Sequence, residues 1–569
     1  MDFTLNLTLD ELIDRTSDER LKPIHLVTNA DECYTTLSQD DKMVLCHLVR
    51  AGSHLEKVYY KLDCEENLEF LEYLNNHLDS KECKLTKILF LAQKSIVGVD
   101  TEGGEVLLAK GDFDRPGKGF YPKDLTTDEF VSIVAKMLDQ NLVDDLKSIF
   151  TVRSVVVRNG EFLKGIDYVD YFKEEFLATA NELELALKYC HDLEFCEYLK
   201  LQIKALKEAN PLLDAYADIK WASMQNSKFE FTITRESYED KMSIAVLEHA
   251  DIVGRLSELD IQVYAKDSIG IRVGLVNKAG TDFIHKLSSS VNIARKLMPY
   301  QDEYKKSKSH TDSKQVVADV DLIALFGDVG AYSGGITIAE NLPNVDKLSL
   351  SMGGGNRNVY HRQVRMSKTE KRAEALLTSK DQKYYDSEAA HWMTICHENT
   401  HSLGPDGSSL GKYSHIIEEL KADMGAYAFL HEFVESGVFT FKEAKKIVVT
   451  GACDDFLKGK PNLSQAHRVR SVMITNRYLE DGAISFDCDF KLHVDYNLLI
   501  ESSKAQLADM VRLQLDGKVS KAKEYIDKYF KWTDSLDKVA TILKQSSKAL
   551  NGKLIESLKD DMLNVSFTA

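Results

Sequence analysis

The sequence predicts an α+β protein with a mixed first half and an almost wholly helical second half. The first observation is a set of short apolar or β-branched runs, separated by turn residues, in the first half. The second is that apolar residues recur at three- and four-residue steps from about residue 366 to the end. With 569 residues, the chain can form two or three compact units.

The expected elements alternate along the first half. Residues 1–90 are mostly helical, with apolar three- and four-residue steps clearest at 68–78. The expected strands are 87–93, 95–100, 105–110, a hairpin over 153–165 that turns at Asn159-Gly160, and 229–234. Helices are expected over 170–225, mixed structure over 241–300, and an exposed polar loop over 302–315.

Composition narrows the possible partners. The chain is 44% hydrophobic and 28% charged, as in folded globular proteins, and its net charge is −18. That charge disfavours nucleic acid or an anionic membrane as a partner and tolerates neutral or cationic small substrates. The nine cysteines show no metal-binding spacing, the N-terminus does not resemble a signal peptide, and no apolar run could cross a membrane. We therefore expect a reducing, cytoplasmic setting.

A metal site is predicted at residues 397–401, which read His-Glu-x-x-His. On a helix, His397 and His401 share one face and can reach one ion, and Glu398 can act as a general base beside it. A cap at Asp386 or Ser387 and a stop at Gly404-Pro405 favour a helix here. The alternative is a surface helix with two solvated histidines.

The next segment weakens that alternative. A second helix is expected from Ser414, and it places Glu419 and Asp423 one turn apart. A Glu-x-x-x-Asp pair after His-Glu-x-x-His is the arrangement of thermolysin-like enzymes, in which the Glu is the third zinc ligand and the Asp orients a ligand histidine. We predict one zinc ion per chain, although two histidines and a carboxylate also suit iron. Cys396 faces about 100° away from His397 and is expected in the core.

The sequence at this point resembles the dipeptidyl peptidase III family, whose second motif, Glu-Glu-x-x-x-Glu/Asp, is matched at 418–423. The resemblance implies that Glu419 is the zinc ligand, and that Glu418 and Asp423 support the ligand histidines. Further similar segments extend over some 240 residues. They imply roles for the following residues: Glu236 and the asparagines Asn341 and Asn344 in holding the peptide's amino-terminal end, and Tyr238 and His467 in catalysis.

These implied roles are chemically consistent. A free ammonium group needs carboxylate and carbonyl acceptors, and the oxyanion of a tetrahedral intermediate needs hydrogen-bond donors. Arg468 and Arg470 are further candidates for holding the peptide. The chain departs from most family members, which have one more residue between the zinc histidines. The i, i+4 spacing leaves zinc binding intact, but this departure puts rate and fine specificity in question.

The resemblance also implies two lobes around a cleft. One lobe, with a small β-barrel and helices, is expected over residues 1–255, with 330–365 returning to it; the other, mainly helical and carrying zinc, is expected over 256–569.

Three functions are compatible with these observations. They are a zinc exopeptidase that removes N-terminal dipeptides from short peptides, a zinc hydrolase with another peptide register or a non-peptide substrate, and a non-catalytic peptide binder. Glu398 disfavours the third, because a binder does not need a general base.

Overall fold

The structure is a computed structural model of the whole chain. It describes residues 2–18, 20–99, 105–237, 240–304, 316–328, 339–342, 349, 352, 357–366, 371–401, 403–405, 407–463, 465–546 and 551–565. The chain divides into two compact units, which are described separately. Unit 1 comprises Met1–Asn277, Gln315–Val364 and Ala549–Ala569, and unit 2 comprises Lys278–Lys314 and Arg365–Lys548.

A five-stranded sheet lies at the centre of unit 1 and has the order β6-β7-β8-β10-β9. Its strands are β6 (Phe229–Ser237), β7 (Asp267–Val276), β8 (Val316–Gly327), β9 (Ala339–Leu342) and β10 (Arg357–His361). The β8–β10 pair is parallel and the other pairs are antiparallel. Every residue of β8 is buried. The five-stranded sheet and the helices of the chain together confirm the predicted α+β class.

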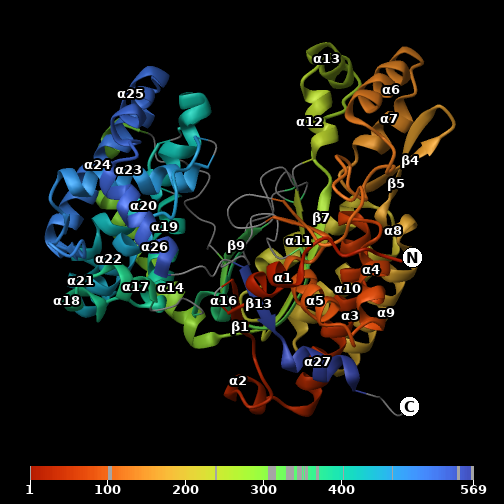
Figure 1. Ribbon diagram of the computed structural model, residues 1–569, viewed down its shortest axis with the longest axis horizontal. Coiled ribbons are helices and arrows are strands. Elements are labelled where there is room, and N and C mark those ends of the chain that lie inside the picture. The colour runs from red at the N-terminus through yellow and green to blue at the C-terminus, as the bar shows by residue number, and fades with distance from the viewer. Residues whose placement is uncertain are drawn as a thin grey trace. The chain divides into compact units, whose positions relative to one another are not determined.

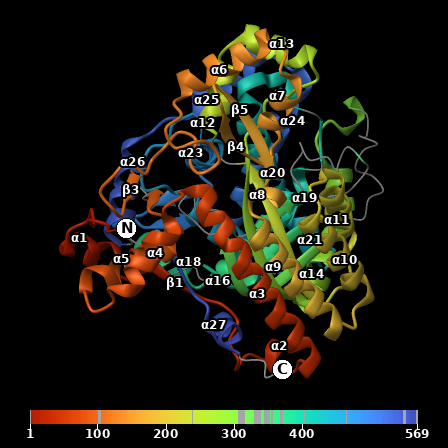
Figure 2. The same ribbon diagram turned by 90° about the vertical axis from the view of Figure 1, so that its right-hand side faces the viewer.

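The long helix α3 (Gln39–Asp63) packs directly on this sheet, against β7 and β8, and α9 (Lys173–Tyr189) packs on α3 (Figure 2). The side chain of Ser38 caps α3 in a capping box with Asp41. A Cβ atom on Gly52 would lie 2.5 Å from the ring of Phe326 in β8, so only glycine allows this close approach.

Other helices and three strand pairs complete unit 1. The helices are α1 (Leu9–Arg15), α2 (Glu32–Thr35), α4 (Asn67–Asn76), α5 (Lys81–Gln93), α6 (Thr127–Asp139), α7 (Val143–Phe150), α8 (Tyr168–Tyr171), α10 (Leu193–Lys207), α11 (Pro211–Ser223), α12 (Lys241–Leu247), α13 (Ala250–Glu258) and α27 (Ser557–Asn564). The boundary between the two units in the sequence falls within α16 (Arg362–Met366). The pairs are β1 (Leu21–His25) with β13 (Asn551–Ile555), β2 (Val97–Val99) with β3 (Glu105–Leu107), and β4 (Ser154–Asn159) with β5 (Phe162–Asp167).

Unit 2 is a helical assembly around α20 (Ser414–Ala428), which packs against α19 (Ser387–His401), α23 (Ala466–Glu480) and α24 (Tyr496–Asp516) (Figure 1). Its other elements are α14 (Lys278–Leu297), η1 (Gln301–Glu303), α17 (Lys371–Leu376), α18 (Ser379–Gln382), η4 (Ser408–Tyr413), α21 (Leu430–Glu435), α22 (Phe441–Asp454), α25 (Val519–Tyr529), α26 (Asp534–Ser546) and the hairpin of β11 (Ile484–Phe486) with β12 (Leu492–Val494). No helix in the described part of the chain has both the length and the apolar character that a bilayer crossing requires.

Two sequence-based expectations differ from the structure. Residues 87–93, expected as a strand, belong to helix α5, which Ser80 caps. A short apolar run fits a strand and a buried helix equally well, and periodicity alone does not distinguish them. The division into units also differs from the expected one: residues 256–277, 315–329 and 549–569 lie in unit 1. The reason is strand pairing, because β7 and β8 are central strands of the sheet and β13 pairs with β1.

Candidate metal centre

Helix α19 carries the first two predicted ligands. The side chain of Asp386 caps its first turn by accepting hydrogen bonds from the backbone N–H groups of Glu388 (2.9 Å) and Ala389 (3.2 Å). The helix ends at His401, and Gly404, with φ of +90°, turns the chain beyond it. Cys396 is buried in the core as expected, and burial raises the pKa of its thiol to about 12.

Helix α20 carries the third ligand and approaches α19 closely. A Cβ atom on Gly425 would lie 2.3 Å from Cγ2 of Thr400, so glycine at this position allows the two helices to meet beside His401. Nearly all of α20 is buried, including Glu419 and Asp423. Buried charges are expensive unless they are paired or bind a metal, so Glu419 and Asp423 both need partners.

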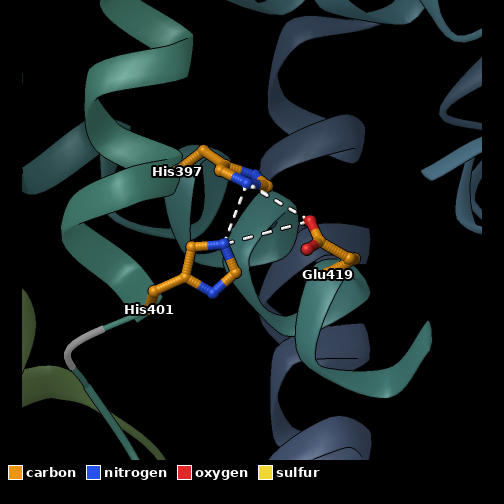
Figure 3. Close-up of side chains that lie close together, drawn as sticks. All are labelled: His397, His401 and Glu419. Atoms are coloured by element: carbon orange, nitrogen blue, oxygen red, sulfur yellow. Dashed lines mark hydrogen bonds and ion pairs between the residues drawn. The ribbon is translucent and has the colours of Figure 1, made fainter. Parts of the chain in front are cut away.

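The structure brings His397, His401 and Glu419 together. The two imidazole Nε2 atoms are 3.1 Å apart, and Oε2 of Glu419 lies 3.4 Å from Nε2 of His397 and 3.9 Å from Nε2 of His401. Figure 3 shows the two rings and the carboxylate directed toward one another. These atoms form one of the groups with the geometry of a metal site.

The chemistry of this donor set fits a zinc ion. Oε2 of Glu419 is buried and, among the described residues, accepts no hydrogen bond of normal geometry. An unsatisfied buried carboxylate oxygen beside two imidazole nitrogens is costly unless a proton or a cation lies between them. Burial would raise the pKa of Glu419, but the imidazoles of His397 and His467 outweigh it and hold the pKa far below its ordinary value. The carboxylate is thus held in its charged, ligand-competent form.

Both candidate ligand histidines have an outer carboxylate partner. Nδ1 of His397 lies 2.6 Å from Oδ1 of Asp423, and Nδ1 of His401 lies 3.0 Å from Oε1 of Glu418. Burial opposes protonation of His397, but Asp423 outweighs it and raises the pKa of His397 to about 10. Carboxylates on Nδ1 orient both rings with Nε2 toward the shared space, as in many zinc sites.

Each outer carboxylate is in turn paired with a cation. Asp423 pairs with Arg470, which also donates a hydrogen bond of 3.0 Å to Asp455. Glu418 pairs with Lys421 at 2.8 Å and accepts a hydrogen bond of 2.7 Å from Gln514. These residues hold the two carboxylates in place. Burial would raise the pKa of Glu418, but His401 and Lys421 outweigh it and lower this pKa.

Sequence reasoning placed Arg470 differently and missed the other residues of this outer layer. Arg470 was a candidate for holding the peptide. Its side chain is largely buried, and its guanidinium group pairs with Asp423, the partner of His397, and with Asp455. Lys421 lies within the second motif, but no role was predicted for it. Gln514 is 96 positions from Glu418 and carries no local signal.

Glu398 and His467, the predicted catalytic groups of unit 2, both lie near the centre. Glu398 follows His397 directly in α19, is half-buried, and its charge contributes to the raised pKa of His397. Nδ1 of His467 lies 3.1 Å from Oε2 of Glu419, while 65% of its side chain is exposed. His467 thus combines contact with a candidate ligand and access to solvent.

The predicted peptide-binding residues belong to unit 1. Glu236 is in β6, where its backbone pairs with Ser268 in β7, and Asn341 is in β9 opposite Asn358 in β10. The structure does not describe their side chains, and Tyr238 and Asn344 lie outside the described residues. The roles of these four residues therefore stay predictions.

Comparisons with known proteins address the fold. No model of a protein family matches the chain. A relative named Nudix hydrolase 3, from Arabidopsis thaliana, is 23% identical over 574 residues, which cover 90% of this chain and 69% of the relative. The structure of DPP III from Caldithrix abyssi matches with a TM-score of 0.79 and 20% identity, over 96% of this chain and 100% of that chain. Dipeptidyl-peptidase III from Corallococcus sp. strain EGB matches with a TM-score of 0.71 and 16% identity, over 98% and 99%.

Fold and site together define an α+β protein of two units, one of which carries a His-Glu-x-x-His group completed by a glutamate from the next helix. The fold is that of dipeptidyl peptidase III over nearly the whole length of the chain. The resemblance noted in the sequence is thus confirmed at the level of the fold.

Proposed function

We propose that this protein is a zinc-dependent exopeptidase that removes dipeptides from the N-terminus of short peptides. The observation that carries the proposal is the group of His397, His401 and Glu419 on a dipeptidyl peptidase III fold. A zinc ion held by three protein ligands keeps a position open and, when bound, supplies Lewis-acid chemistry.

The residues around the centre provide the remaining functions. Glu398, one position from a ligand and half-buried, takes the proton of the attacking water and passes it to the leaving amine. His467, exposed beside Glu419, donates a hydrogen bond to the oxyanion of the tetrahedral intermediate. Asp423 and Glu418 keep the two ligand rings oriented.

The dipeptide register rests on the resemblance to the family. Glu236, Asn341 and Asn344 would hold the ammonium group and the first residues of the peptide, and Tyr238 would act with His467 on the oxyanion. Short neutral or cationic peptides suit the net charge of −18 better than nucleic acid or an anionic membrane does. All nine cysteines are free thiols, which suits a reducing compartment such as the cytoplasm.

The name of the Arabidopsis relative does not assign an activity to this chain. The match leaves almost a third of that relative uncovered, so the activity in its name is not tied to the shared part. A hydrolase with a different peptide register or a non-peptide substrate is the alternative on this fold, and it would share the metal centre without needing Glu236 or Asn341.

The proposal is tested with peptides of four to eight residues, incubated with the zinc-loaded full chain and analysed by mass spectrometry. We expect release of N-terminal dipeptides, and a loss of about 10²- to 10⁴-fold in rate for Glu398→Gln with zinc content unchanged. Glu388→Gln is the matched control, because Glu388 lies in the first turn of the same helix. No cleavage at one zinc per chain would exclude the peptidase, and cleavage in another register would favour the alternative.

A further inference from the structure

Unit 1 contains a cavity of about 430 Å³. Its wall is formed by the end of α7, by α10 and α11, by strand β6 and by the segment that leads into β7. Cavities of about 300–1,000 Å³ are the usual size for small-molecule sites. Among the described residues of this wall, none belongs to the candidate metal centre or to the predicted peptide-holding set. The cavity therefore has no role in the chemistry considered so far.

The wall presents two buried polar atoms that lack a hydrogen-bond partner among the described residues. The hydroxyl of Tyr198 donates its proton to the carbonyl of Phe231 at 2.8 Å, so it accepts from Nε2 of Gln202 at 3.2 Å. This contact fixes the orientation of the Gln202 amide and leaves its buried Oε1 without a donor. Oγ of Ser349 is the second such atom. Buried acceptors of this kind need a donor, which a ligand rich in N–H groups would supply.

The charges of the wall favour a cation. It carries four carboxylates and two basic groups: Asp214, Asp218, Asp260 and Asp267 against Lys147 and Arg153. Arg153 pairs with Asp214 and also lies 3.8 Å from Asp167, so its charge is already balanced. Lys147 is exposed to solvent. The remaining carboxylates give the cavity an excess of negative charge, which attracts cations and repels anions.

The apolar part of the wall is rich in aromatic rings, namely Phe150, Tyr198, Trp221 and Tyr264. Aromatic side chains bury the apolar body of a ligand, and the faces of their rings attract ammonium groups. Rings, carboxylates and an unused amide oxygen together recognise an amine that carries an apolar group.

We infer that the cavity in unit 1 binds a small organic ammonium ion, a primary amine on an aromatic or other apolar body. Its N–H groups donate to Oε1 of Gln202, and the carboxylates of the wall balance its charge. The site does not depend on the proposed peptidase activity, because its residues lie in unit 1 and the candidate zinc ligands lie in unit 2.

Isothermal titration calorimetry of the full-length protein tests the site with three probes that share one body and differ in charge: phenethylamine, phenethyl alcohol and phenylacetate. We expect phenethylamine to bind, the alcohol to bind at least about tenfold more weakly, and phenylacetate not to bind at millimolar concentration. Affinity for the amine should be equal in the zinc-loaded and metal-free protein. Equal binding of the three probes, or binding of the amine only when zinc is present, would overturn the inference.

Two variants locate the bound amine. Gln202→Leu keeps a similar volume and removes the acceptor, so we expect phenethylamine to bind at least about tenfold more weakly. Asp218→Asn changes a half-buried position and should weaken binding at least about threefold, since it removes one negative charge from the wall. Thermal unfolding without ligand shows whether each variant is folded.

Glu197→Gln is the matched control. Glu197 lies in α10, is 66% exposed, pairs with Lys220 of α11 at 2.7 Å and is not part of the cavity wall. This variant loses the same charge as Asp218→Asn and should bind phenethylamine like the unmodified protein. Unweakened binding in both Gln202→Leu and Asp218→Asn, or equal weakening in Glu197→Gln, would overturn the site.

The same ammonium chemistry is present at the amino terminus of a peptide. Competition in the metal-free protein between phenethylamine and the tripeptide Phe-Gly-Gly, with a free or an acetylated amino terminus, separates the two sources. We expect neither tripeptide to displace phenethylamine. Displacement by the free form alone would overturn the assignment to a small free amine and make the cavity a site for peptide amino termini.

Discussion

Two buried glutamates, Glu230 in unit 1 and Glu419 in unit 2, differ in how the structure satisfies their carboxylate oxygens. Glu230 is fully buried, and both of its oxygens have donors: Trp221 and Thr232 bond to Oε1, and Arg357 bonds to Oε2 at 2.8 Å. Glu419 is nearly as buried, yet its Oε2 accepts no hydrogen bond of normal geometry from the described residues.

The difference lies in what surrounds each carboxylate. Around Glu230, an indole, a hydroxyl and a guanidinium group satisfy the charge and hold α11, β6 and β10 together. Around Glu419, imidazole nitrogens lie at 3.1–3.9 Å without closing a hydrogen-bond network. A buried carboxylate with satisfied oxygens stabilises the fold, whereas one that faces several imidazoles at these distances is arranged to receive an ion.

The largest effect should come from Glu419→Gln. A neutral amide is a poor zinc ligand, so we expect zinc binding at His397, His401 and Glu419 to be weakened by more than about a hundredfold. Metal analysis after dialysis measures this. Thermal unfolding of the metal-free protein should change little, because Oε2 accepts no hydrogen bond of normal geometry from the described residues. A large loss of stability would make Glu419 a structural residue like Glu230.

Glu230→Gln should have the opposite effects. It leaves the buried guanidinium of Arg357 without its counter-charge, and breaking a buried pair in this way costs about 3–5 kcal/mol of unfolding free energy. Denaturant unfolding of the metal-free protein measures the loss, and zinc content of the folded variant should remain at the level of the unmodified protein. Unchanged stability would remove the distinction between the two glutamates.

Asp423→Asn should weaken zinc binding at His397, His401 and Glu419 without abolishing it. The variant replaces the carboxylate that lies 2.6 Å from His397 by an amide, and loss of such a partner lowers metal affinity about 10–100-fold. Competition with a chelator measures the change. Glu418→Gln is the comparison, and its effect should be smaller because His401 is more exposed than His397. Equal zinc affinity in Asp423→Asn would show that Asp423 does not support the ligand.

The smallest effect concerns Asp455, behind Arg470. Burial and the nearby Asp423 raise the pKa of Asp455 to about 7 although Arg470 acts against the shift. An acid whose pKa is raised on folding stabilises the folded state fully below its ordinary pKa, and this contribution is lost as pH rises through 7. Relative to Asp455→Asn, the unmodified protein should lose about 1.4 kcal/mol of unfolding free energy between pH 6 and pH 8.

Denaturant unfolding of both proteins at the two pH values measures this difference, and other titrating groups contribute equally to both proteins. The same pH dependence in Asp455→Asn would mean that Asp455 is charged over this pH range and that Arg470 satisfies its charge.

Much of the fold could be read from local patterns. Helices α4, α9, α19 and α20, the β4–β5 hairpin and strand β6 match sequence expectations, because capping residues, apolar periodicity and the Asn159-Gly160 turn act over a few positions. The second half of helix α5, residues 87–93, was predicted as a strand because a short apolar run fits a strand and a buried helix equally well. The alternating pattern of residues 229–234 predicted a strand but did not show that Glu230 and Thr232 would both be buried.

The sequence by itself determined the candidate ligand set. The spacing of His397, His401 and Glu419 on two successive helices is a local property, and helical geometry converts it into a shared face. Only the tertiary structure decided which side chains support that set. Arg470, Lys421 and Gln514 reach the two outer carboxylates through the packing of α19, α20, α23 and α24, whose contacts join residues far apart in the chain. The same packing placed β7 and β8 in the sheet of unit 1, since strand pairing is a long-range choice that local patterns do not encode.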